Sequence, residues 1–102
     1  MTNPKTGLEM ISPYFVEGVG DVLTYGANKY ARNNWLRGMS YAVVFGGIMR
    51  HLWAWFRGED LDPKEKGGSG LPHLYHAACG IMFLIHYTNK PEYKTFDDRV
   101  FK

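Results

Sequence analysis

Two long apolar segments, residues 41–57 and 72–89, lie on either side of a short polar stretch, and this pairing constrains the fold of the 102-residue chain most. Both segments have the length and the spacing of apolar residues that helices show, and neither alternates as a strand does. Residues 58–70 between them are polar and rich in glycine, which is typical of a loop. The sequence therefore predicts two helices that are joined by one loop.

Local signals place the helix boundaries and add a third helix. Ser12 before Pro13 predicts the start of a helix over about residues 13–31, and Ser40 predicts the cap of the helix over 41–57, which Gly58 ends. Pro91 follows the last helix. The expected fold class is all-α, with one domain over residues 1–102 and three main helices packed as a bundle. Residues 1–11 read as a loose lead-in, and residues 90–102 as a C-terminal arm that is either a short helix or a docking segment.

The apolar content predicts a homo-oligomer. The chain is 45% hydrophobic and carries 16% aromatic residues, whereas a chain of this size buries only about 60–65% of its unfolded surface. The helix over 72–89 is apolar on every side, which predicts that it is fully buried. We therefore expect a second copy of the chain to complete the bundle.

Several function classes are excluded by composition. A net charge of +2 without a run of basic residues argues against a nucleic-acid partner. No segment reads as a signal peptide or as a membrane span, so a cytoplasmic protein without a membrane partner is expected. The single cysteine, Cys79, excludes an intrachain disulfide and a cysteine-based zinc site.

Three of the four histidines lie close to the ends of the two apolar helices. His73 and His76 are spaced so that both leave one helical face, and Ala77 and Gly80 on that face are small enough to leave room for an ion. His51 comes from the preceding helix and reaches the same layer if the register permits. A metal or catalytic site and a purely structural set of hydrogen-bonded histidines both remain open.

Three carboxylates, Glu59, Asp60 and Asp62, follow directly after the second helix. Acidic residues at a helix C-terminus oppose the macrodipole, so their position there suggests a task such as ligating a divalent ion. A solvated turn is the alternative. Histidines together with carboxylates suit Mn²⁺, Co²⁺ or Zn²⁺ better than Ca²⁺, and carboxylates also suit Mg²⁺. The glycine-rich residues 64–70 of the same loop are expected to be mobile.

Basic and aromatic residues near the first loop could bind a nucleotide. The basic residues that could neutralise phosphates are Lys29, Arg32, Arg37 and, from the second helix, Arg50. The flat side chains that could contact a base are Tyr25, Tyr30 and Trp35, although each could equally be a core residue or a loop anchor.

Taken in order, a set of short motifs resembles one known family. They are Tyr25-Gly26-Ala27-x-Lys29-Tyr30, Asn34-Trp35-x-x-Gly38, Arg50-His51-Leu52-x-Ala54-Trp55, Gly58-Glu59-Asp60-Leu61-Asp62-Pro63, Ser69-Gly70-Leu71-Pro72-His73-Leu74-x-His76-Ala77-Ala78-Cys79 and Phe83-Leu84. Together they resemble the N-terminal domains of phage dATP/dGTP diphosphohydrolases. The motifs cover residues 25–84, which is over half of the chain.

The resemblance implies a phage enzyme that hydrolyses a purine deoxynucleoside triphosphate to the monophosphate and pyrophosphate in the host cytoplasm. It also suggests the wider group of all-α, oligomeric MazG-like pyrophosphohydrolases, whose Glu-x-x-Glu and Glu-x-x-Asp metal motifs this chain lacks. A small helical interaction protein, or a nucleotide sensor without catalysis, is the alternative.

On this basis we assign candidate roles to individual residues. The expected metal ligands for Mg, Mn, Co or Zn are His51, Glu59, Asp60, Asp62, His73 and His76. Glu59, Asp62 and His76 are the expected catalytic residues. The expected substrate-binding residues are Lys29, Tyr30, Trp35, Arg37 and Arg50.

Overall fold

The computed structural model describes residues 5–102 and is all-α in this range, as predicted. Its main elements are the helices α1 (Pro13–Lys29), α2 (Tyr41–Phe56) and α3 (His73–Thr88). Four short 3-10 segments complete it: η1 (Leu8–Met10), η2 (Asn34–Arg37), η3 (Lys64–Lys66) and η4 (Pro91–Phe96). The helices therefore begin where the sequence predicted, within one residue, and each ends one or two residues earlier.

Both predicted serine caps are confirmed. The Ser12 hydroxyl accepts a hydrogen bond from the Tyr14 N–H at 3.2 Å, and the Ser40 hydroxyl accepts one from the Val43 N–H at 3.2 Å. Each bond satisfies one of the backbone donors that a helix start leaves unpaired. Gly58 adopts a φ of +99°, a conformation that favours glycine, and so accounts for the end of α2.

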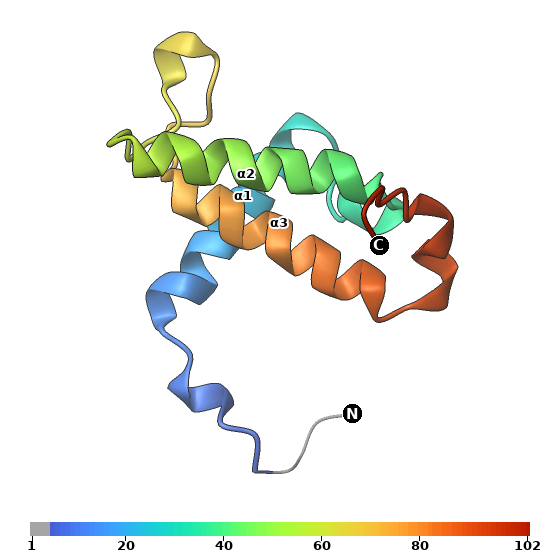
Figure 1. Cartoon of the computed structure of the whole chain (residues 1–102). Coiled ribbons are helices and arrows are strands. Elements are labelled where there is room, and N and C mark those ends of the chain that lie inside the picture. Colours follow the sequence, from blue (N-terminus) through green and yellow to red (C-terminus); the bar gives the residue numbers. More distant parts are fainter. Residues whose placement is uncertain (1–4) are drawn as a thin grey trace.

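Helix α3 is the centre of the fold, and it packs against both α2 and α1 (Figure 1). A glycine lies at each crossing. A Cβ on Gly80 would lie 2.6 Å from Cγ1 of Ile48 in α2, and a Cβ on Gly18 of α1 would lie 2.8 Å from the ring of Tyr75 in α3. The expectation that Ala77 and Gly80 leave room for an ion is therefore wrong, because Gly80 is filled by Ile48 and Ala77 is buried in the core cluster.

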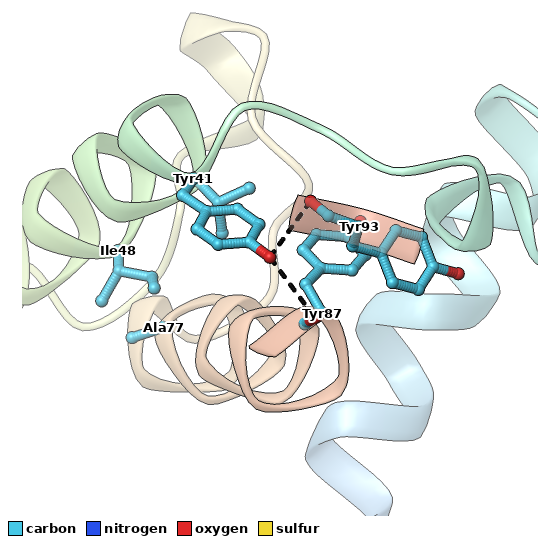
Figure 2. Packing of buried hydrophobic residues seen from close by; sticks show 6 residues of the cluster. Tyr41, Ile48, Ala77, Tyr87 and Tyr93 are labelled. Carbon is cyan, nitrogen blue, oxygen red and sulfur yellow. Dashed lines mark hydrogen bonds between the residues drawn. The ribbon is translucent and has the colours of Figure 1, made fainter. Parts of the chain in front are cut away.

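Three tyrosines close the core at the far end of the α2–α3 pair (Figure 2). The Tyr41 hydroxyl donates to the backbone carbonyls of Tyr87 and Tyr93 at 3.3 and 3.2 Å. The Tyr87 hydroxyl in turn donates to the carbonyl of Trp35 at 2.5 Å. Trp35 stacks on Phe83 at 4.9 Å, which confirms that its ring anchors the first loop.

Residues 90–102 were expected to form either a short helix or a docking segment, and the structure shows both: the arm contains η4 and then packs on the start of α2. After η4 the chain returns to the start of α2 (Figure 1), where Asp98 accepts hydrogen bonds from the Ser40 hydroxyl and, at 2.9 Å, from the Ala42 N–H. A carboxylate from a distant part of the sequence thus caps α2 and interacts favourably with its dipole.

One expectation about exposure needs correction. Helix α3 is not fully buried in the single chain, because Leu74, Ile81 and Ile85 are 41%, 45% and 58% exposed. The predicted lead-in forms η1 and then enters α1, whose first half projects away from the other helices (Figure 1); residues 1–4 lie outside the described range. No helix within residues 5–102 combines the length and the hydropathy that a membrane span requires.

Candidate active site

The loop between α2 and α3 is folded around Asp62. Its two ends pair through an antiparallel bridge between Leu61 and Pro72, and the Asp62 N–H donates to the carbonyl of Leu71 at 2.8 Å. Further along, the Gly70 N–H donates to the Asp62 carbonyl at 2.7 Å, which Gly70 reaches with a φ of +81°. The expectation of a mobile segment is therefore wrong for the base of the loop, although its tip around η3 is exposed.

This loop brings two carboxylates to the three histidines. His51 Nδ1 lies 2.8 Å from His73 Nδ1, and His73 Nε2 lies 2.8 Å from Oε1 of Glu59. The rings of His51 and His76 stack at 4.6 Å, and His76 Nε2 lies 3.7 Å from Oδ2 of Asp62. The register of α2 and α3 thus does place His51 in the same layer as His73 and His76. We call these five residues the His–carboxylate cluster.

Ser69 is a member of the site that we did not predict. Its hydroxyl lies 2.6 Å from His76 Nε2 and 3.3 Å from Oδ2 of Asp62, and its own N–H donates to the same carboxylate oxygen at 3.0 Å. The side chain is buried, with 9% exposure. Ser69 therefore links His76 to Asp62. Its glycine neighbours allow a tight turn, but no local sequence pattern predicts that this turn folds back over Asp62.

Burial and charge keep two of the histidines neutral. Burial, reinforced by the neighbouring His76, lowers the pKa of His51 to about 4. Burial also lowers the pKa of His76, against the opposing effect of Asp62. Burial opposes ionisation of Asp62, but the Ser69 N–H and His76 hold the pKa of this carboxyl below its usual value. At neutral pH the cluster therefore contains neutral imidazoles beside a carboxylate.

The order of donors and acceptors in the cluster can be assigned in part. Because the Glu59 carboxylate only accepts, Nε2 of His73 carries the proton of that hydrogen bond. His51 is neutral at neutral pH because burial lowers its pKa to about 4, so one of its two ring nitrogens carries no proton. Such a nitrogen can bind a proton or a metal ion.

The donor types of the cluster fit a divalent transition metal, because imidazole nitrogens and carboxylate oxygens are its preferred ligands in proteins. Ligation also requires neutral imidazoles, which the lowered pKa values of His51 and His76 provide. Within residues 5–102, however, no group of three or more His, Cys, Asp or Glu side chains is already arranged to hold an ion. The cluster atoms are instead hydrogen-bonded to one another and to Ser69.

A cavity of about 780 Å³ opens beside the cluster. It lies between the second half of α1, the loop with η2, and α3, and His76 forms part of its wall. Such a volume is within the range of sites that hold small molecules. Of the predicted substrate-binding residues, those that line the cavity are Lys29, Tyr30 and Trp35. Arg32, Tyr25 and Asn34 line it as well.

Three of the predicted site residues have side chains outside both the His–carboxylate cluster and the cavity. Asp60 is exposed and joins the site through its backbone, since its carbonyl accepts from the His73 N–H at 2.9 Å. Arg50 is exposed and its guanidinium is turned back towards Gly46 and Gly47 of its own helix. Arg37 is exposed at the end of η2 and is not part of the cavity lining.

The fold and the site define a class: a small all-α domain in which a His–carboxylate cluster adjoins a cavity with basic and aromatic walls. Comparison with known proteins identifies the family. The model of the family "dATP/dGTP diphosphohydrolase, N-terminal" matches residues 1–99, and the chain belongs to this family. The resemblance that we inferred from the motifs is thereby confirmed.

One curated relative is a dATP/dGTP diphosphohydrolase of Salmonella phage PMBT28, to which the chain is 36% identical over 95 residues. The aligned region covers 93% of this chain and 30% of the relative, so the chain spans less than a third of that protein's length. No solved structure matches the chain.

Proposed function

We propose that the chain binds a purine deoxynucleoside triphosphate in the cavity and hydrolyses it to the monophosphate and pyrophosphate. The observation that carries this proposal is the position of His76, which belongs both to the His–carboxylate cluster and to the wall of the 780 Å³ cavity. A neutral proton acceptor thus adjoins a space of small-molecule size. The name of the phage relative supports a purine nucleotide as the substrate, and the host cytoplasm is the compartment in which such a reaction would act.

In the proposed complex, one set of cavity residues contacts the phosphates of the nucleotide and another set contacts its base. Lys29 and Arg32 would neutralise the phosphates, because both line the cavity and are exposed at its edge. The ammonium of Lys29 lies 5.4 Å from the ring centre of Tyr30, so cation and ring share one part of the wall. The aromatic residues Tyr25, Tyr30 and Trp35 would contact the base. Arg37 and Arg50 lie outside the lining, and we assign them no direct contact.

The proposed reaction is attack of water on the α-phosphorus. His76 would accept a proton from the water, while a new bond forms between the water oxygen and phosphorus. The bond from this phosphorus to the bridging oxygen breaks, and its electron pair leaves with pyrophosphate. Asp62, acting through Ser69, would stabilise the protonated His76, and Glu59 would hold the orientation of His73.

A divalent ion would strengthen this chemistry. We propose that His51, Glu59, Asp62, His73 and His76 would hold Mg²⁺, Mn²⁺, Co²⁺ or Zn²⁺ when it binds. Such an ion neutralises phosphate charge and lowers the pKa of bound water.

One observation favours a second candidate function. The cluster side chains are hydrogen-bonded to one another and to Ser69, as in a structural polar network, and the chain covers only 30% of the phage relative. A nucleotide sensor that binds without hydrolysis would show the same cavity and the same cluster.

Pyrophosphate release from dGTP, dATP, dCTP and dTTP, each with Mg²⁺, Mn²⁺ or Co²⁺, tests the proposal. The informative pair of variants is His76→Asn and, as the matched control, His86→Asn, which alters a histidine that packs on Trp35 and Tyr93 outside the cluster. Loss of a general base typically costs about 10²–10⁴-fold in turnover, so His76→Asn should lose at least about 100-fold while His86→Asn stays close to wild type.

A second pair separates binding from turnover. Lys29→Ala should raise the KM for the purine nucleotide, and Lys94→Ala, in the distant η4, should not. Wild-type turnover in His76→Asn would refute the assigned role. Nucleotide binding without any pyrophosphate release would establish the sensor instead.

A further inference from the structure

The α2–α3 pair carries a continuous row of apolar side chains on each helix. At about 100° per residue, one flank of each helix collects residues spaced by four, three and four positions. On α2 these are Phe45, Met49, Leu52 and Phe56, and on α3 they are Leu74, Ala78, Ile81 and Ile85. We call these eight residues the apolar face. Phe45, Phe56 and Ile85 are 57%, 72% and 58% exposed, whereas Leu52 is partly buried against the core.

Both rows lie on the same side of the pair. One flank of α3, with Gly80, contacts Ile48 of α2. A second flank, with Tyr75, contacts Gly18 of α1. The row with Ile81 and Ile85 occupies the third flank, away from α1. In antiparallel helices, flanks that are rotated in the same sense from the shared contact lie on one side, so the α2 row and the α3 row face the same side of the pair. Figure 1 views the pair from this side, with α1 passing behind it.

The chain exposes more area than a folded monomer of its mass usually does. A folded monomer of this mass is expected to expose about 5,900 Å², whereas the chain exposes 7835 Å², about a third more. A standard interface removes about 800 Å² from each partner, and obligate homodimers remove more. The excess of about 2,000 Å², to which the projecting N-terminal segment contributes, is larger than the area that one partner loses in a standard interface.

The composition of the face fits a second copy of the same chain. None of its eight residues is charged or polar, as in the core of an obligate interface and unlike the rim of a transient one. The four-three-four spacing is the one that lets helices pack side by side with interlocking side chains. Two copies related by a two-fold axis would bring four such rows together.

We propose that the apolar face is a homodimer interface, in which α2 and α3 of one chain pack on α2 and α3 of another as a four-helix core. This inference is independent of the reaction proposed above, since a catalytically inactive chain would form the same dimer.

Light scattering coupled to size exclusion, with sedimentation over about 1–100 μM chain, tests the interface. The wild type should have at least twice the 11.7 kDa of one chain. The double variant Ile81→Glu/Ile85→Glu places two charges in the face and should be monomeric, or at least about 100-fold weaker in self-association. The control is Val43→Glu, on the opposite flank of α2 and 65% exposed, which should keep the wild-type mass.

A milder variant keeps the test decisive if the charged one does not fold. Ile81→Ala/Ile85→Ala favours helix and removes only apolar area, so it should fold and weaken self-association by at least about tenfold. A wild type of 11.7 kDa at the highest concentration would overturn the proposal. A folded double variant with the wild-type mass would overturn it as well.

Discussion

Replacement of Gly80 by alanine tests the close approach of α2 and α3 most sharply. In an exposed helix position this change stabilises by about 1 kcal/mol, because glycine loses more backbone entropy on folding. At Gly80, however, the new Cβ would lie 2.6 Å from Cγ1 and 3.2 Å from Cδ1 of Ile48. Carbon atoms in contact are normally about 3.5–4.0 Å apart, so the helices would have to separate.

The expected size follows from these opposing effects. Overpacking a core typically costs about 1–3 kcal/mol, which offsets or exceeds the helical gain and leaves a net loss of about 0–2 kcal/mol. Gly20 in α1 is the matched control, since a Cβ there meets nothing within 4 Å. Gly20→Ala should therefore gain about 1 kcal/mol, and the two variants should differ by about 1–3 kcal/mol.

Urea denaturation at one fixed chain concentration measures this difference, because the stability of an oligomer depends on concentration. The midpoint should fall for Gly80→Ala relative to Gly20→Ala, with an unchanged m-value. Adding Ile48→Ala to Gly80→Ala should relieve the clash, so the double variant should lose less than the sum of the single losses. Equal stability of Gly80→Ala and Gly20→Ala would refute the close crossing.

Three other predictions concern separate parts of the molecule. Tyr41→Phe removes a hydroxyl that donates to two backbone carbonyls, and it should cost about 1–2 kcal/mol in urea denaturation; an unchanged midpoint would count against the tyrosine network. Hydrogen bonds from the Ser40 hydroxyl and the Ala42 N–H hold the pKa of Asp98 below its usual value, so Asp98 contributes stability above the unfolded pKa of about 4 and loses it as the pH falls. Asp98→Asn should therefore be less stable than the wild type at pH 6, and the difference should shrink as the pH falls below about 4. Parallel stability curves would contradict this assignment. Mn²⁺ should raise the Tm of the wild type by mass action and EDTA should reverse the rise, whereas His51→Ala should respond to neither; an equal shift in both proteins would place the ion elsewhere.

Much of the fold could be predicted from local sequence signals. The serines at 12 and 40 and the glycine at 58 act within one helical turn, so the boundaries follow from neighbouring residues alone. The exposed row with Ile81 and Ile85 could not be separated from the core, because an interface and a core use the same side chains. Periodicity counts apolar residues and does not say which partner covers them.

Part of the site could also be predicted from local sequence signals. The spacing of His73 and His76 places both on one face, and the loop length brings Glu59 and Asp62 near them. Ser69 was missed, because its role depends on how the loop folds back over Asp62, and no local pattern encodes that. The role of Gly80 was misjudged, since a small residue can leave space for an ion or be filled by a neighbouring helix, and only the position of Ile48 decides between them.

The products of dGTP hydrolysis in H₂¹⁸O test the central claim most directly. The 102-residue chain is incubated with dGTP and Mg²⁺, Mn²⁺ or Co²⁺, and the products are analysed by mass spectrometry. Attack on the α-phosphorus predicts dGMP that carries one ¹⁸O atom, together with unlabelled pyrophosphate. Formation of dGDP and phosphate, label in the pyrophosphate, or no turnover of any purine nucleotide by a folded protein would contradict the account.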